Sequence, residues 1–256
     1  MYLDLDVHYG DGVAAAFRGA GSRGQVLTLS IHHAAHGFFP PSEHSALPDP
    51  SSTLFDPFTL SLPLHAGASC ATFMRVWQAV DRILTTFAPD YIVLQCGVDG
   101  LAGDPIGAWN WSLGGEGGFA WFVRRVLDYS AKVLLLGGGT LFGSSMGDNR
   151  WPLTCHLGGY SPVNTARAWA LLTSLTVRRA SLTKLLVYDI WSSEQRGEPL
   201  VLDTPIPPHA AFPMYAPSFT LDVPAGNVRD ENSDEYLTEI DSIFERITAI
   251  LRTQLV

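Results

Sequence analysis

The stretch Tyr2-Leu-Asp-Leu-Asp-Val-His-Tyr-Gly-Asp-Gly12 decides how this chain folds. Its apolar residues alternate with two acids and a histidine, which is the period of an extended strand. The pattern predicts a strand that carries Asp4, Asp6 and His8 on one face and the apolar side chains on the other. Burying such groups without partners costs on the order of several kcal/mol each, so a bound cation is the expected partner. A polar strand face open to water is the alternative.

Composition bounds the class of protein. A chain of 256 residues with 46% hydrophobic and 16% charged residues is long and apolar enough for one α/β domain. The formal net charge of −9 argues against direct nucleic-acid binding, which requires a basic surface, and is compatible with a lysine-rich partner.

The cysteines and the apolar runs indicate the compartment. Cys70, Cys96 and Cys155 form no C-x-x-C pair and leave an odd thiol, which favours a reducing environment. No apolar run is long enough to span a bilayer, and no secretion signal is evident. We therefore expect a nuclear or cytoplasmic protein without membrane contact. Because the chain begins inside its predicted first strand, we also expect a longer natural N-terminus.

Short apolar runs alternate with helical periodicity along the chain, which predicts a parallel sheet with helical crossovers. Ligands of such sheets bind beyond the carboxyl ends of the strands. The expected strands, after the first, are Val26–Ile31, Tyr91–Gln95 and Lys132–Leu136. An amphipathic helix is expected over Ser233–Arg252.

A second acidic residue follows the predicted strand Tyr91–Gln95. Asp99 lies in a turn of small residues just past the strand end. With Asp6 and His8 it makes a set of one histidine and two carboxylates, and three protein ligands with an open position are typical of catalytic zinc. Mn²⁺ and Fe²⁺ also suit these ligand types, so the residues alone leave the metal open.

Three segments in order resemble the zinc-dependent histone deacetylases of the class I kind. They are Tyr2–Val13, Gln95–Pro105, and Gly158-Gly-Tyr160 followed by Asn164–Trp169. The resemblance implies the arginase/deacetylase fold, an α/β fold whose mostly parallel sheet is flanked by helices. Residues 1–256 would form a single, partial deacetylase domain that lacks its first part. The implied activity is hydrolysis of N-acetyl-lysine on histone tails or other proteins by a zinc-activated water.

The resemblance also implies ligands for two cations. Zinc would be held by Asp6, His8 and Asp99. A structural potassium ion would be held by Asp4, Ser30 and backbone carbonyls that include the one of Ile31.

Catalytic and tunnel roles carry over in the same way. Tyr160 would donate a hydrogen bond to the acetyl oxygen. Asp4 and Asp11 would orient the two histidines of the family's general base. Phe39 and Ile106 would line the narrow tunnel for the acetyl-lysine stem.

The sequence departs from the family in its general base. The family's adjacent histidine pair, upstream of the first zinc ligands, is absent. The pair His32-His33 follows a different strand and does not match it. A general base contributes roughly 10²- to 10⁴-fold to the rate, so we expect impaired hydrolysis by this chain alone.

Two blocks interrupt the resemblance. Residues 140–157 separate Gly137 from Tyr160, and a second non-matching block spans about 176–195. Translated introns in a gene prediction that also missed upstream exons would explain them, and genuine surface loops are the alternative.

Two other functions remain open. A catalytically inactive scaffold could keep the fold and bind the subunits of a corepressor complex. An amidohydrolase of acetylated polyamines is the other possibility, although the class I-like tyrosine segment argues against it.

Overall fold

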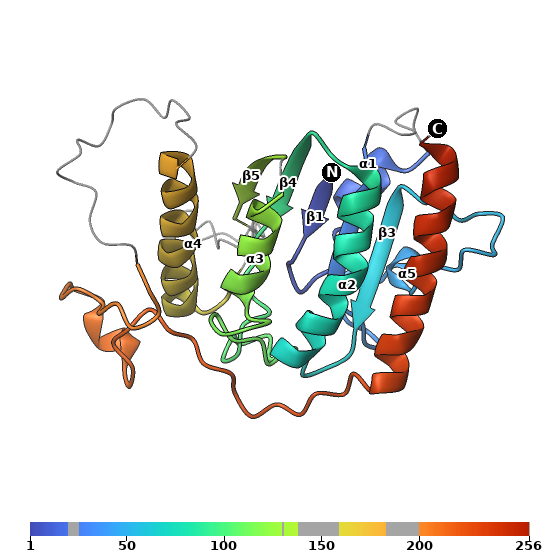
Figure 1. The fold of residues 1–256 in the computed structure, drawn as a ribbon. Helices are drawn as coiled ribbons and strands as arrows, with labels where there is room; N and C mark the ends of the chain where they lie inside the picture. The colour runs from blue at the N-terminus through green and yellow to red at the C-terminus, as the bar shows by residue number, and fades with distance from the viewer. Residues whose placement is uncertain (20–25, 130, 138–158, 183–199, 256) are drawn as a thin grey trace, which may run out of the picture.

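The computed structural model describes residues 1–19, 26–129, 131–137, 159–182 and 200–255. Its centre is a five-stranded sheet in the order β3-β2-β1-β4-β5, and all neighbouring strands are parallel (Figure 1). The predicted α/β class with a parallel sheet is therefore confirmed. The strands are β1 (Tyr2–Asp4), β2 (Thr28–His33), β3 (Thr59–Leu64), β4 (Tyr91–Gln95) and β5 (Lys132–Leu136).

Helices flank the sheet. Figure 1 shows α2 and α3 lying across one face of it, with α5 beside α2. The ion pairs Arg75–Asp234 and Arg82–Asp241 join α2 to α5. Helix α4 packs against α3. The helices are α1 (Asp11–Phe17), α2 (Cys70–Phe87), α3 (Phe119–Leu127), α4 (Pro162–Leu182) and α5 (Asp234–Gln254), with short 3₁₀ turns at Glu43–Ser45 and Phe212–Tyr215.

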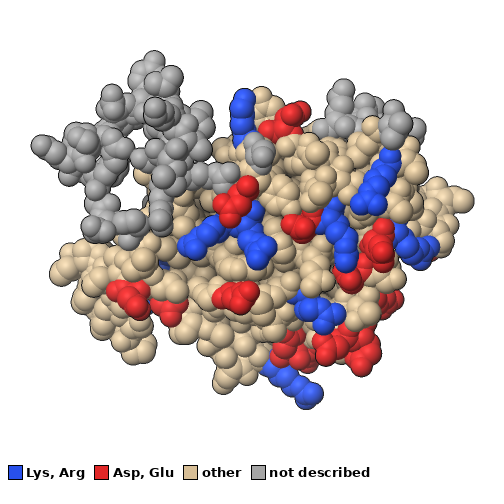
Figure 2. All heavy atoms as spheres, in the orientation of Figure 1, with Lys and Arg blue, Asp and Glu red and all other residues tan. Residues whose placement is uncertain are grey.

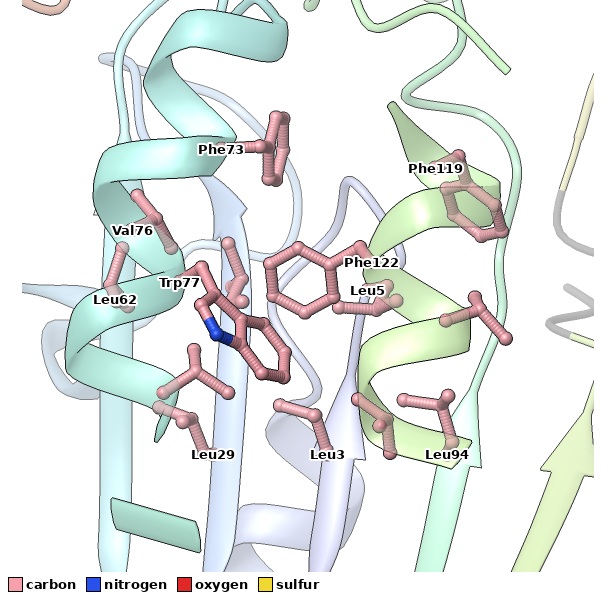
Figure 3. Close-up of a cluster of buried hydrophobic side chains, with 14 of the residues drawn as sticks. Leu3, Leu5, Leu29, Leu62, Phe73, Val76, Trp77, Leu94, Phe119 and Phe122 are labelled. Carbon is pink, nitrogen blue, oxygen red and sulfur yellow. The ribbon is translucent and has the colours of Figure 1, made fainter. Parts of the chain in front are cut away.

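The core lies between the sheet and helices α2 and α3. Figure 3 shows Phe73 and Trp77 of α2 and Phe122 of α3 facing strand leucines such as Leu3 and Leu94. All five side chains are buried. Full burial of a large apolar side chain contributes about 1.5–3 kcal/mol, so this layer holds the strands rigidly beneath the loops that follow them.

The first strand is shorter than the alternating sequence predicts. It ends at Asp4, and the backbone bends from Asp6 to His8. One nearby and one sequence-distant carboxylate cause this bend: the Asp6 N–H donates to Asp4 Oδ1, and the Val7 N–H donates to Asp99 Oδ1. Side-chain carboxylates thus take backbone donors that a neighbouring strand would otherwise use. The strand predicted at Val26–Ile31 is likewise displaced by two residues, to Thr28–His33.

The two predicted interruptions of the family resemblance fall largely outside the residues that the structure describes. The interruption at 140–157 lies outside the described residues, as does most of the one at about 176–195. Helix α4 continues to Leu182, past the start of the second interruption.

Within the described residues, no helix is both long and apolar enough to cross a membrane.

Candidate metal centre

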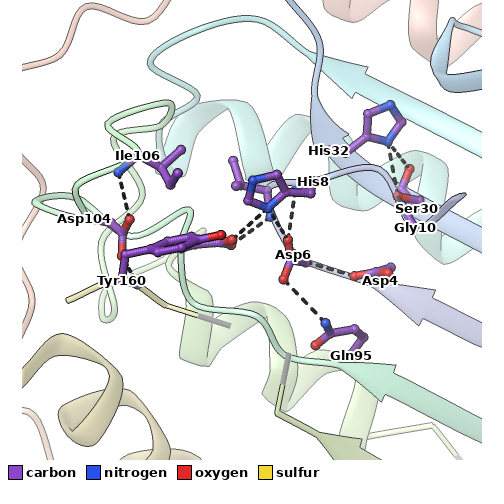
Figure 4. A network of polar contacts seen from close by, with 12 residues as sticks. Asp4, Asp6, His8, Gly10, Ser30, His32, Gln95, Asp104, Ile106 and Tyr160 are labelled. Atoms are coloured by element: carbon purple, nitrogen blue, oxygen red, sulfur yellow. Dashed lines mark hydrogen bonds and ion pairs between the residues drawn. The ribbon is translucent and has the colours of Figure 1, made fainter. Parts of the chain in front are cut away.

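Asp6, His8 and Asp99 meet at the carboxyl edge of the sheet. Asp6 and His8 follow β1, Asp99 follows β4, and these strands are neighbours in the sheet. One donor atom from each residue lies within 4.8 Å of the other two. Figure 4 shows the His8 ring directed at Asp6 between the ends of these strands. The sheet thus brings together three residues that are up to 93 positions apart in sequence, as the sequence predicts.

The distances in this cluster suit one small cation. His8 Nδ1 lies 2.9 Å from Asp6 Oδ1 and 3.0 Å from Asp99 Oδ2. Tetrahedral ligands about 2.0–2.2 Å from zinc lie about 3.3–3.6 Å apart, so a slight opening would admit the ion. A Cβ at Gly97 would lie 2.4 Å from Asp6 Oδ2, so only glycine lets the β4 loop approach this closely. The residues present therefore fit a three-ligand zinc site.

The two carboxylates of the cluster favour the protonated form of His8. Burial by itself lowers the pKa of His8, but hydrogen bonds to Asp6 and Asp99 and their negative charges raise it well above its usual value. Burial and the nearby Asp6 charge raise the pKa of Asp99. A cation that replaces the His8 proton would relieve the repulsion between the two carboxylates.

Asp4 and Ser30 lie next to each other on β1 and β2. They are register partners, and both are buried. Asp4 accepts hydrogen bonds from the Asp6 N–H at 3.0 Å and from the Tyr2 hydroxyl at 2.9 Å. Burial, followed by the charge of Asp6, raises the pKa of Asp4 well above its usual range. The Gly10 N–H donates to Ser30 Oγ, and a Cβ at Gly10 would lie 2.6 Å from Asp4 Oδ2.

Aromatic rings surround His8. Phe38 stacks on it with ring centroids 5.3 Å apart, and Phe39 and Tyr160 approach its edge or face at 6.3 Å each. Phe39 is exposed at 68%, which suits a residue at a rim. Sequence reasoning missed the role of Phe38, which is the closer of the pair. Phe38 and Phe39 are adjacent residues of the same type, so the sequence cannot show which of the two side chains points toward His8.

Asp104 is a second residue that sequence reasoning did not single out. Its carboxylate accepts hydrogen bonds from the backbone of Tyr160 at 2.8 Å and of Ile106 at 3.0 Å. Figure 4 shows Asp104 and Ile106 on the side of Tyr160 away from the sheet. The predicted tunnel residue Ile106 and the predicted hydrogen-bond donor Tyr160 are thus held by one side chain.

Asp11 is not part of the cluster. It is exposed in the first turn of α1, and its carboxylate accepts the Gly12 N–H at 2.7 Å. Within the described residues, the Asp11 carboxylate forms no hydrogen bond or ion pair with Asp6, His8 or Asp99. Its predicted role concerns a histidine that this sequence lacks.

The rings of His32 and His33 form hydrogen bonds with the backbone. His32 Nε2 lies 2.9 Å from the Ser45 carbonyl oxygen, and His33 Nδ1 lies 3.1 Å from that of Leu64. Burial lowers the pKa of His32 to about 4, so this ring is neutral near pH 7. These contacts agree with the prediction that the pair does not replace the family's base.

Comparison with known proteins identifies the family of this chain. A family profile described as "Histone deacetylase domain" matches residues 1–148. Histone deacetylase 8 of Xenopus tropicalis is 30% identical over 94% of this chain and 52% of its own length. Histone deacetylase 9 of Arabidopsis thaliana is 27% identical over 94% of this chain and 45% of its own length. The chain thus spans about half the length of these relatives, and it belongs to the histone deacetylase domain family.

Proposed function

We propose that this chain carries the metal-binding part of a zinc-dependent deacetylase that acts on N-acetyl-lysine. The observation that carries the proposal is the Asp6, His8 and Asp99 cluster with Tyr160 at its edge. Metal ligands, a hydroxyl donor and apolar walls at one edge of a parallel sheet are what hydrolysis of a neutral amide side chain requires.

Asp6, His8 and Asp99 would hold the zinc and leave one coordination position open. A bound zinc ion would supply Lewis acidity toward the acetyl carbonyl and would lower the pKa of a water molecule from about 15.7 to roughly 7. The three side chains are one-fifth exposed or less, so solvent has limited access to the ion.

The walls of the site would select the acetylated side chain. Tyr160 would donate a hydrogen bond to the acetyl oxygen, and comparable donors contribute about 2.7–4 kcal/mol in the transition state. Phe38, Phe39 and Ile106 would surround the aliphatic stem of the lysine. A charged lysine would lose its hydration in this apolar surrounding, so the neutral acetylated form is preferred.

Proton transfer is the weak point of this chain. His32 and His33 donate ring N–H groups to the backbone carbonyl oxygens of Ser45 and Leu64, so neither is expected to act as a base at the cluster. Loss of a general base costs roughly 10²- to 10⁴-fold in rate. We therefore propose that the chain binds acetyl-lysine and hydrolyses it slowly or not at all by itself.

We also propose a structural potassium ion at Asp4, Ser30 and the Ile31 carbonyl. The support is the burial of Asp4 beside Asp6 without an ion-pair partner in the described part of the chain. A bound cation would stabilise its charged form.

The proposed substrates are acetylated histone tails or other acetyl-lysine proteins in the nucleus or cytoplasm. The names of the relatives and the net charge of −9 support a basic partner. Figure 2 shows acidic and basic side chains intermixed over the visible face, without the basic stripe typical of a nucleic-acid-binding surface.

A scaffold in a corepressor complex is the second candidate, and the engagement of His32 and His33 with backbone carbonyl oxygens rather than with the cluster favours it. The deciding experiment measures zinc content, binding of an acetyl-lysine peptide and its hydrolysis for this chain, with Asp99→Asn and Tyr160→Phe as controls. A second protein, extended upstream to include the histidine pair and lacking 140–157, is assayed in parallel.

The deacetylase proposal expects zinc and peptide binding by this chain, and turnover by the extended protein that both substitutions abolish. Zinc binding without peptide binding or turnover in either protein would instead support the scaffold. A preference for acetylated polyamines over peptides would assign the polyamine activity.

A further inference from the structure

The loop after β4 carries two buried carboxylates with different partners. Asp99 faces the metal cluster, whereas Asp104, five residues later, faces the segment that carries Tyr160. Both side chains are at most 5% exposed. Gly103, at a φ of +81°, provides the left-handed turn that separates them.

Asp104 uses both carboxylate oxygens on backbone donors. Oδ2 accepts the N–H of Tyr160 at 2.8 Å and that of Ser161 at 3.1 Å. Oδ1 accepts the N–H of Ile106 at 3.0 Å. Tyr160 and Ser161 are 56 and 57 residues away in sequence, so this carboxylate joins two distant segments directly at the site.

These hydrogen bonds are the main compensation for burying the charge. Burial raises the pKa of Asp104, while the three N–H groups and the charge of His8 counteract that rise. Within the described residues no Lys, Arg or His forms an ion pair with it. A buried carboxylate without such donors would be strongly unfavourable, so its position is fixed by the backbone of Tyr160 and Ser161.

The same contacts set where the Tyr160 ring lies. The Tyr160 backbone is held by Asp104, and its ring lies 6.3 Å from the ring of the predicted zinc ligand His8. Next to it, Ser161 precedes α4, which starts at Pro162. The tyrosine thus sits between a helix start and the loop that carries Asp99, and Asp104 connects the two.

We propose that Asp104 is a positioning residue that acts through Tyr160: it holds the phenol facing the metal cluster and keeps Ile106 in register with it. The proposal rests on the proposed function only in giving the Tyr160 hydroxyl a role toward the acetyl group. A residue that merely anchored α4 would affect the stability of the fold without changing the place of the Tyr160 ring.

The test labels the tyrosines of the full chain with 3-fluorotyrosine and follows the Tyr160 resonance by ¹⁹F NMR. Loss of one signal in Tyr160→Phe assigns it. Spectra of the Zn²⁺- and Co²⁺-loaded chain give the paramagnetic shift of Tyr160, which depends on the distance of its ring from the metal. The variants are Asp104→Ala, which removes all three hydrogen bonds, and Asp104→Asn, whose amide oxygen can keep the pair at Tyr160 and Ser161.

The matched control is Asp230→Ala. Asp230 also accepts several hydrogen bonds, including those of the Ser69 N–H and the Thr72 hydroxyl, but it joins the segment before α5 to α2. We expect Asp104→Ala to reduce the paramagnetic shift by at least half, Asp104→Asn to reduce it less, and Asp230→Ala to leave it unchanged while lowering Tm. An unchanged shift and line width of Tyr160 in Asp104→Ala would overturn the proposal.

A double-mutant cycle on peptide binding supplies the second readout. With the zinc-loaded chain, Asp104→Ala should weaken binding of an acetyl-lysine peptide about 3- to 10-fold, the value of one net hydrogen bond. In a Tyr160→Phe background the same change should have a smaller effect, because only the part that acts through Ile106 remains. Additive losses would contradict the proposal.

Failure of the proposed function gives a different pattern. If the chain binds neither Co²⁺ nor peptide, the metal assignment is wrong, and the metal-free ¹⁹F spectrum decides the positioning question by itself. A Tyr160 resonance that moves or changes width in Asp104→Ala but not in Asp230→Ala supports positioning, and one that stays unchanged in both overturns it.

Discussion

His8 follows β1 and His32 is the penultimate residue of the neighbouring parallel strand β2, yet the fold shifts the pKa values of these two histidines in opposite directions. His8 lies between two carboxylates that raise its pKa, whereas burial lowers the pKa of His32 to about 4. His8 is the proposed metal ligand, and His32 packs as a neutral ring near pH 7. The difference shows that the neighbours of a histidine, rather than its place at a strand end, decide what it can do.

The largest expected effect comes from removing one of the two carboxylates that flank His8. We expect Asp99→Asn to weaken zinc binding at least about a thousandfold, because a lost ligand costs more than the roughly 10- to 100-fold of outer-shell changes. Competition with a chromophoric chelator measures the affinity. Asp104→Asn, in the same loop, is the control that should retain zinc. Wild-type affinity in Asp99→Asn would remove Asp99 from the ligand set.

The raised pKa of His8 predicts that zinc affinity rises with pH. Below that pKa the ring of the metal-free chain holds a proton, which zinc must displace. One displaced proton gives about tenfold per pH unit, hence about a hundredfold between pH 6.5 and 8.5. Titrations at several pH values test this. His32→Gln should show the same slope, and a flat profile in the wild-type chain would show that no such proton is displaced.

The lowered pKa of His32 predicts a loss of stability in acid. The unfolded chain binds a proton on this residue below about pH 6.5, but the folded chain does so only below about 4. Between these two pH values the chain therefore takes up a proton when it unfolds. The free energy of unfolding should decrease by about 2 kcal/mol as the pH is lowered from 6.5 to 5. Urea unfolding of the wild type and of His32→Gln at several pH values measures this contribution as the difference between their free energies of unfolding. Equal pH dependence of the two proteins would contradict it.

The smallest expected effect is the difference in stability between alanine variants of the two adjacent phenylalanines that contact His8. Phe38 lies between the rings of His8 and His33, with centroids 5.3 and 4.7 Å away, so Phe38→Ala should lower the free energy of unfolding by about 1–2 kcal/mol. Phe39 is exposed, and Phe39→Ala should stay within about 0.5 kcal/mol. Thermal melts compare them. Peptide binding should instead weaken in Phe39→Ala, and an equal loss of stability in both variants would refute the distinction.

Much of the fold follows from the sequence because its signals are local. The strands β4 and β5 begin and end at the predicted residues, and α5 begins one residue after the predicted start. Apolar runs and helical periodicity report burial directly, so these elements can be predicted without knowledge of their partners.

Other elements escaped because their signals are weak or mixed. Strand β3 contains a proline, Pro63, and α1 is a short helix of seven residues, three of them alanine, with little periodicity. The early end of β1 at Asp4 depends on Asp99, which is distant in sequence. Edge position and long-range hydrogen bonding decide such cases, and neither can be predicted from a local pattern.

The sequence by itself determined the residue types of the site. Asp6 and His8 in a buried alternation, and Asp99 after a strand, are chemically suited to a cation wherever they meet. Only the tertiary structure decided which atoms meet, that Phe38 stacks on His8, and that Asp104 holds Tyr160. The physical reason is that ligand chemistry belongs to each residue type, whereas the distance and direction between segments up to 93 residues apart arise only when the parallel strands pack side by side.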